Sequence, residues 1–373
     1  MDQRRSILSD GLIWYIWVGN GHFDRKRFDM VTPFIPPQTI MGNAGSSNAP
    51  PGPLTLTQIN SILSPAQQPA IAAAAGYNVP TFGAGMFLNT NWFLHGFYSP
   101  PSGGAAQNGN GIYLDGTGNG YGICTAKAGA GHTWTGTTFG GGAYIEALLS
   151  FPPSASPGAH WPAFWSQDIE TLSQNAITAA NAWGGPTYNG ATAYTIGQMV
   201  SLSGLSYRCI ANTTGNAPPN ATFWQGPYGN WVEPDFFELD AGNITKYGIQ
   251  MHNWYGTIPG ASNVNCVTSG SPVTIPASVS FANFNKIGWL WIPATATTQG
   301  SAQWFFNGAQ MGPTVNWNQY NSGLAPPPAV GGSAGSILDQ RHLALVLNTN
   351  TTCPTQIVSV QVWQASAAGN LVQ

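Results

Sequence analysis

Charged side chains are scarce in this sequence. Lys, Arg, Asp and Glu together make up 6% of the 373 residues, with 10 basic and 13 acidic side chains and a net charge of −3. So small a net charge gives no basis for binding nucleic acid across a broad surface, because such binding depends on neutralising many phosphates. An aromatic-rich and charge-poor surface suits neutral carbohydrate better, since sugar rings stack their C–H faces on Trp and Tyr.

Cysteine is also rare. The four cysteines lie far apart in the sequence and lack the close pairs that metal sites use; they are Cys124, Cys209, Cys266 and Cys353. They are either buried thiols or members of one or two disulfides, and the sequence leaves both open. No cofactor is expected, with a structural calcium ion left open as the exception.

Long apolar segments are missing as well. The longest early run covers residues 12–18, which is too short to cross a membrane. Asp2 and Asp10 interrupt the basic and apolar regions that a signal peptide would need. We therefore expect no membrane span, and an extracellular or virion-surface location without a clear signal peptide.

The residues that are abundant predict an all-β protein. The chain has 47 Gly, 29 Pro and 15 Trp residues, and short strands joined by Gly, Pro and Asn turns are typical of a sandwich. Residues 1–80 differ from the rest, because half of the basic residues fall within the first 27 positions and Pro-rich sequence follows. This segment is interpreted either as an arm that docks to another protein or particle, or as a partly disordered tail.

The most unusual stretch is residues 231–240, which concentrate acidic side chains. Glu233, Asp235 and Glu238 fall within six residues of a chain that has few charges. On a regular strand Glu233 and Asp235 share a face, and Glu238 points to the opposite side. One extra residue at Phe236–Phe237, a β-bulge, would bring Glu238 back to their face. The sequence therefore predicts three carboxyl groups on one surface.

Such a row of carboxyl groups is suited to cleaving glycosidic bonds. Close carboxylates cannot all ionise cheaply, so at least one pKa should rise and leave a protonated acid near neutral pH. A carboxylate beside a carboxylic acid is the equipment of a glycosidase, and a short separation suits the retaining route. The alternatives are a solvated acidic strand or a calcium site built from the same oxygens.

The pattern Glu233-x-Asp235-x-x-Glu238 resembles the catalytic signature of glycoside hydrolase family 16, the laminarinase, lichenase, agarase and carrageenase group. Other segments resemble strands of that family in the family's order: residues 87–92, 139–147, 161–165, 248–254, 284–291 and 304–308. The Arg that usually follows the second of these is replaced by Leu148, which leaves its salt bridge in doubt. The resemblance implies a concanavalin A-like β-jelly-roll sandwich over residues 81–373.

The resemblance also implies a role for each residue of the row. Glu233 would be the nucleophile, Glu238 the acid/base, and Asp235 the group between them that tunes the pair. The sugar subsites would be formed by side chains on the same surface: Trp231, His252, Trp254, Trp161 and Trp165. The reaction expected is endo-cleavage of a β-linked polysaccharide with retention of configuration.

Residues 182–227 interrupt the family pattern between Trp165 and Glu233. Their spacing of Trp, Tyr and Gly resembles the small chitin-binding type modules of carbohydrate-binding families 5 and 12. The resemblance implies that exposed aromatic rings bind sugar, most plausibly Trp183, Tyr188 and Trp224. The alternative is that some of these rings form the core of so small a unit.

A competing hypothesis is that the protein has the same fold but does not catalyse a reaction. The missing signal peptide, the N-terminal arm and the module type, which is also found on phage tails, favour a non-catalytic glycan-binding or virion decoration protein. A phage-borne depolymerase would combine both functions. The carboxyl row favours the enzyme, because a pure binder has no need to maintain the strain of three close acids.

Overall fold

The computed structural model describes most of the chain from residue 68 onward and a short hairpin before it. The described residues are 7–9, 12–14, 68–83, 85–96, 104–115, 121–128, 134–150, 162–169, 187–196, 198–203, 205–228, 230–239, 245–255, 262–265, 267, 270–319, 334–339, 341–349 and 353–372. Two compact units are present, residues 1–67 and residues 68–373. In the first unit the described part is the hairpin of β1 (Ile7–Ser9) and β2 (Leu12–Trp14).

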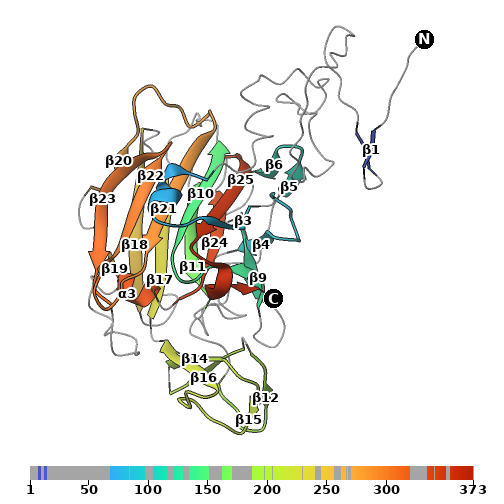
Figure 1. Cartoon of the computed structure of the whole chain (residues 1–373), viewed down its shortest axis with the longest axis vertical. Helices are drawn as coiled ribbons and strands as arrows, with labels where there is room; N and C mark the ends of the chain where they lie inside the picture. Colours follow the sequence, from blue (N-terminus) through green and yellow to red (C-terminus); the bar gives the residue numbers. More distant parts are fainter. Residues whose placement is uncertain are drawn as a thin grey trace. The chain divides into compact units, whose positions relative to one another are not determined.

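The second unit is built around two antiparallel eight-stranded sheets, which confirms the expected jelly-roll sandwich (Figure 1). The site sheet runs in the order β19 (Ser262–Asn265), β18 (Lys246–Tyr255), β17 (Asn230–Glu238), β11 (Ala163–Asp168), β24 (Leu343–Thr349), β7 (Tyr121–Cys124) and β4 (Phe93–Gly96), with β20 (Val273–Thr274) paired to β18. The backing sheet runs in the order β23 (Ala309–Trp317), β22 (Gly300–Phe306), β21 (Asn285–Ile292), β10 (Ala143–Ser150), β25 (Thr355–Gln364), β6 (Gly111–Leu114) and β5 (Ala105–Asn108), with β3 (Val79–Phe82) paired to β25.

The core of the sandwich is formed by alternate residues of the facing strands. On β10 the buried core residues are Ala143, Ile145, Ala147 and Leu149, while the residues between them point away. This alternation of core contacts follows from the period of 2 of a strand, and Tyr144 is buried on the opposite face. Across the core, the rings of Phe236 and Trp289 stack with their centroids 4.7 Å apart. Aromatic rings from both sheets therefore contribute to the core that joins them.

The opposite face of the backing sheet is covered by residues that the sequence analysis assigned to the N-terminal arm. The short helix α2 (Ala70–Ala74) precedes Tyr77, whose hydroxyl donates to the carbonyl of Trp291 at 2.7 Å. Ala72 and Tyr77 pack against Tyr144 and other outward side chains of that sheet. Residues 68–80 thus belong to the sandwich unit, because they bury an apolar face that would otherwise meet water.

Glu146 on β10 has a cation partner, although Leu148 stands where a basic residue was expected. Glu146 lies 2.9 Å from Nζ of Lys286 on the neighbouring strand β21, and it accepts a hydrogen bond from the hydroxyl of Tyr144 at 2.9 Å. Burial and the nearby Glu146 charge raise the pKa of Tyr144. The doubt about a salt bridge on this strand is resolved by a cation from the next strand.

Three remaining elements complete the sandwich unit. A small sheet has the order β26 (Leu371–Val372), β9 (Trp134–Thr138) and β8 (Ala126–Ala128). The helix α3 (Ala334–Leu338) precedes Asp339, whose carboxylate accepts from Nε1 of both Trp291 and Trp317. The 3₁₀ helix η3 covers Ala367–Gly369.

The inserted segment forms its own small β unit within residues 187–228. Its strands are β12 (Ala193–Tyr194) paired with β15 (Thr213–Thr214), and β13 (Met199–Leu202), β14 (Leu205–Cys209) and β16 (Trp224–Tyr228) in one sheet. Nη1 of Arg208 in this module lies 3.3 Å from Nδ1 of His342, the residue before β24. The module therefore has a contact with the sandwich at the end of the site sheet.

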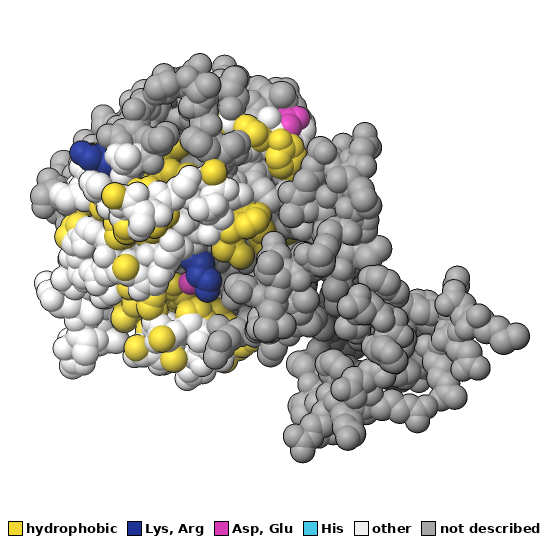
Figure 2. Space-filling model, turned by 90° about the horizontal axis from the view of Figure 1, so that it is seen from above, with side chains coloured by type: hydrophobic (Ala, Val, Ile, Leu, Met, Phe, Trp, Pro, Cys, Tyr) yellow, Lys and Arg dark blue, Asp and Glu magenta, His cyan; other side chains and the backbone are white. Residues whose placement is uncertain are grey.

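The surface of the described residues carries few charges, as the composition of the sequence predicts. Figure 2 shows one face on which few charged side chains appear among the described residues.

Cys124, Cys209 and Cys353 are buried free thiols, and Cys266 lies outside the described residues. Burial raises the pKa of the Cys353 thiol to about 11. In the described part of the chain, no helix has the length and apolar character to span a membrane.

Candidate active site

The three carboxyl residues of β17 lie on one face because of the predicted bulge. Against β18, Asp235 pairs with Gln250 and Glu238 with Gly248, so three steps on β17 match two on its neighbour. Against β11, Asp235 pairs with Trp165 and Phe237 with Phe164, which places the extra residue at Phe236. An extra residue resets the alternation of the strand after it. The predicted bulge at Phe236–Phe237 is confirmed.

The environment on either side of the bulge agrees with this register. Phe236 and Phe237 are both buried in the core between the sheets. A Cβ on Gly248 would lie 3.8 Å from Oε2 of Glu238, so this carboxyl group lies over the glycine of β18. Glu233 and Glu238 are half-buried, whereas Asp235 is 1% exposed. The two glutamates flank a buried aspartate along one row.

The environment of Asp235 perturbs its ionisation. Burial, followed by the negative charge of Glu238, holds the pKa of the Asp235 carboxyl well above its usual range. The expectation that one carboxyl of the row has a raised pKa is confirmed, and the structure shows the shift at the middle residue. Removing a carboxylate from water disfavours its charged form, and a like charge nearby adds to that effect.

His252 joins the row from the neighbouring strand. Its Nε2 lies 3.1 Å from Oδ2 of Asp235, and its side chain is 17% exposed. In the register of β17 and β18, His252 stands opposite Glu233. His252 was expected to contact sugar, and the structure adds a carboxyl partner for it.

Glu233, Asp235 and His252 form a group that could hold a metal ion. One ligand atom each from Glu233, Asp235 and His252 lie within 4.8 Å of one another. A set that includes an imidazole suits zinc better than calcium, which prefers oxygen ligands alone. Chemically, the arrangement can therefore act as a proton-transfer site or as a ligand set for a divalent cation.

The bulge also creates a hydrogen bond across the core. Nε1 of Trp304 on β22 donates to the backbone carbonyl of Asp235 at 2.7 Å. Trp304 is fully buried, and a bulge disrupts the regular ladder of backbone hydrogen bonds. An indole from the backing sheet thus binds the backbone of the residue at the centre of the row. The resemblance of residues 304–308 to a strand gave no sign of this contact.

We predict that Trp304→Phe destabilises the protein and lowers the activity of the site. The substitution leaves a buried carbonyl without its donor, which costs about 1–3 kcal/mol in addition to the lost volume. Chemical unfolding measures the free-energy change.

Trp289→Phe is the matched control. It shortens an equally buried indole whose Nε1 has no hydrogen-bond partner in the described part of the chain. Equal losses of unfolding free energy in both variants would contradict the importance of the Trp304 hydrogen bond.

Two of the tryptophans expected to bind sugar are buried. Trp165 stands beside Asp235 in the sheet, but it is 6% exposed and its Nε1 donates to Oδ1 of Asn348. Trp224 is 3% exposed, and its Nε1 donates to the carbonyl of Asn216 at 2.7 Å. These two expectations are corrected: neither ring offers a free face for a sugar.

The burial of Trp224 has a simple physical reason. The module has few residues with which to build a core, so its largest side chains fill the interior. Trp224 lies 5.2 Å from Tyr194 between ring centroids, and Tyr188 stacks on Tyr194 at 5.5 Å. Tyr188 is half-buried, so part of its side chain is accessible to a ligand.

The other expected sugar contacts lie beyond the described side chains. Trp161 and Trp183 are outside the described residues. Trp231 and Trp254 stand opposite each other in the register of β17 and β18, although only their backbone is described. Their strand positions have the same parity as Glu233 and His252, as the alternation predicted.

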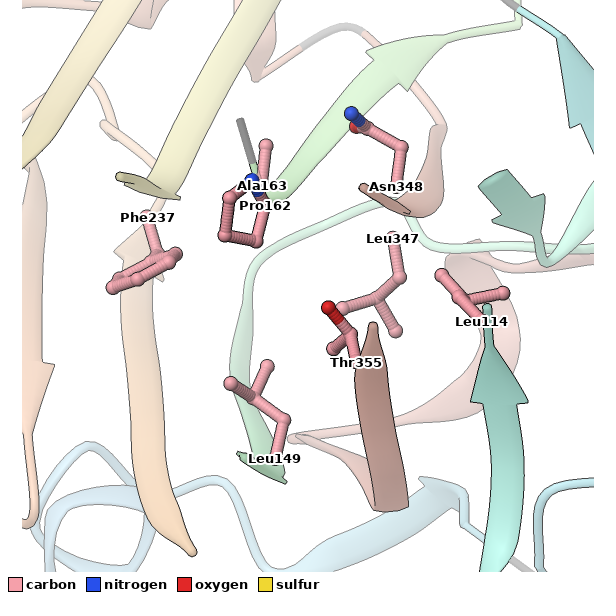
Figure 3. Close-up of a pocket in the computed structure, with 8 residues that line it drawn as sticks. All are labelled: Leu114, Leu149, Pro162, Ala163, Phe237, Leu347, Asn348 and Thr355. Carbon is pink, nitrogen blue, oxygen red and sulfur yellow. The ribbon is translucent and has the colours of Figure 1, made fainter. Parts of the chain in front are cut away.

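A small cavity lies on the core side of the site sheet and is separate from the carboxyl row. Figure 3 shows its lining, which is mainly apolar: Leu114, Leu149, Pro162, Ala163, Phe237, Leu347, Asn348 and Thr355. None of the three carboxyl groups lines it. The cavity is therefore a packing feature between the sheets and no part of the candidate site.

Comparison with known proteins gives results at the level of structure. No family model and no curated protein match the sequence. Among solved structures, the chain is similar to LamAcat from Zobellia galactanivorans, with 13% identity, coverage of 78% of this chain and 99% of that one, and a TM-score of 0.36. It is also similar to β-agarase A from the same organism, with 8% identity, coverage of 76% and 83%, and a TM-score of 0.35.

A third similar structure is the catalytic domain of a laminarinase, an endo-1,3-β-glucanase, from Thermotoga petrophila. Its identity is 13%, the coverage is 69% of this chain and 73% of that one, and the TM-score is 0.31. Scores of this size carry no argument about the reaction.

Proposed function

We propose that this protein is an endo-acting glycoside hydrolase that cleaves a β-linked polysaccharide with retention of configuration. The observation that carries the proposal is the bulge in β17, which brings Glu233, Asp235 and Glu238 to one face of the site sheet. A bulge and a buried acid are costly features, and such features persist mainly where function needs them. Neither is required to build a sandwich.

In the proposed reaction, the two half-buried glutamates have different roles. Glu233 attacks the anomeric carbon and forms a glycosyl-enzyme ester, while Glu238 gives its proton to the departing glycosidic oxygen. Glu238 then takes a proton from water, which attacks the ester, releases the sugar and restores both carboxyl groups.

Asp235 separates and tunes the pair. Because its raised pKa favours the neutral form, it can donate a hydrogen bond to a charged neighbour. A neutral group at this position also avoids adding a negative charge beside the Glu233 carboxylate. His252, 3.1 Å from Asp235, fixes the orientation of that carboxyl group.

The proposal extends to the sugar contacts and the location. Trp231, Trp254 and Trp161 remain proposed subsite residues, and Tyr188 and Trp183 remain the proposed sugar contacts of the inserted module. The proposed setting is extracellular or on a virion surface, with part of residues 1–67 as the docking arm.

The test is the release of reducing ends by the purified protein from a panel of polysaccharides. The panel contains laminarin, lichenan, agarose, carrageenan, chitosan and bacterial capsule. We expect release from at least one polymer, with short oligosaccharides appearing early because cleavage is internal, and with the first product carrying the anomeric configuration of the substrate. Binding to a polymer without any release would contradict the enzyme and favour a glycan-binding decoration protein.

A further inference from the structure

Among the described residues, the half of β17 that carries Glu233 is not paired through its backbone with β11. Pairing between β11 and β17 runs from Ala163 opposite Glu238 to Trp165 opposite Asp235, and it ends there. The next residue of β17 is Pro234, which has no N–H to donate. On its other side β17 remains paired with β18 as far as Asn230. Glu233 therefore lies on a strand segment that is held regularly from one side.

On the side of β17 that faces β11, the buried carboxylate of Asp168 accepts a hydrogen bond from the backbone of β17. Oδ2 of Asp168, the last residue of β11, accepts a hydrogen bond from the backbone N–H of Val232 at 3.2 Å. Continuing the register beyond Trp165 and Asp235 would place Asp168 opposite Val232. The side chain thus provides an acceptor at the position where a ladder carbonyl would otherwise be expected.

Asp168 is itself fixed by an ion pair. Nε of Arg341, which precedes β24, lies 3.3 Å from the same Oδ2 atom. Asp168 is fully buried and Arg341 is 2% exposed, so both charges have been removed from water. Buried ion pairs often contribute little net stability compared with apolar replacements, and one use of such a pair is to specify a geometry.

We propose that Asp168, held by Arg341, is a positioning residue that sets the backbone of Val232 and thereby the carboxylate of Glu233. The proposal rests on the proposed function, in which Glu233 is the nucleophile. Attack on an anomeric carbon is sensitive to small displacements of the attacking oxygen, and a shift of about 1 Å can reduce a rate by roughly 100-fold. The clamp acts through the backbone and touches no reacting atom.

Two double variants separate positioning from stability. Asp168→Asn with Arg341→Met removes the ion pair but keeps an oxygen that can accept from Val232. Asp168→Leu with Arg341→Met removes the pair and the acceptor together. Both replace the buried charges by neutral side chains, and thermal unfolding of the full chain measures how stability differs between them.

We expect the Leu-containing variant to have a kcat roughly tenfold or more below that of the Asn-containing variant, with similar KM values. Hydrogen exchange at the Val232 amide, read at single-residue resolution, should be at least about tenfold faster in the Leu-containing variant. A residue with a purely structural role would change kcat only in step with thermal stability. Equal kcat values in two folded variants would overturn the positioning role.

The exchange measurement also protects the test against a variant that fails to fold. In the unmodified protein the Val232 amide should be protected, and exchange as fast as that of an exposed amide would overturn the clamp directly. Loss of protection with unchanged kcat would refute positioning and leave the proposed function intact. Protection at Val232 in a protein that cleaves no glycan would instead refute the proposed function, and the positioning role with it.

Discussion

Glu233→Gln is expected to lower the rate of polysaccharide cleavage by roughly 10⁴-fold or more, while the protein stays folded. Gln has nearly the same shape as Glu but cannot form the glycosyl ester, so the first step of the reaction is lost. Glu233 is half-buried on the face of the site sheet, and its replacement disturbs no core contact. Reducing-end release, compared with the unmodified protein on the same polymer, measures the effect.

The control is a carboxylate outside the row. Glu146→Gln changes a buried glutamate on β10 that is paired with Lys286 on the backing sheet. It should keep its activity, although it loses an ion pair. If Glu233→Gln retained full activity, the nucleophile would be misassigned; if both variants lost activity equally, the effect would come from folding and not from chemistry.

Asp235→Asn is expected to stabilise the protein increasingly as the pH rises above the unfolded pKa, by up to about 1 kcal/mol per pH unit. The pKa of Asp235 in the folded protein is raised above its unfolded value, first by burial and then by the charge of Glu238. The folded state therefore binds more protons than the unfolded state between the two pKa values. The stability contributed by neutral Asp235 is complete below the unfolded pKa and is lost as the pH rises through the folded pKa.

The sign of this effect gives a distinctive measurement. Asn is permanently neutral, so the difference in Tm between Asp235→Asn and the unmodified protein should grow as the pH rises above about 4, the unfolded pKa of Asp. The other ionisable groups beside Asp235 are Glu233, Glu238 and His252, and each remains present in both proteins. Glu146→Gln should show no such gain, because its charge has a cation partner. A Tm difference that is constant with pH, or that shrinks as the pH rises, would contradict the raised pKa.

The sequence by itself determined the features that depend on neighbouring residues along one strand. Alternation and the bulge are local properties of a strand, so the spacing of Glu233, Asp235 and Glu238 was sufficient to predict one shared face. The composition was likewise sufficient to predict an all-β sandwich, because Gly, Pro and aromatic residues at high frequency leave few alternatives.

Only the tertiary structure decided which side chains are buried and which atoms meet across the fold. The hydrogen bond from the Trp304 indole to the Asp235 carbonyl joins residues that are 69 positions apart in the sequence. The hydrogen bond from the Val232 N–H to Asp168 joins residues that are 64 positions apart. Exposure depends on what covers a face, which is why the rings of Trp165 and Trp224 were expected at the surface and are found inside. The same reason places the raised pKa on Asp235, since desolvation is set by all the chain that surrounds a group and not by its neighbours in sequence.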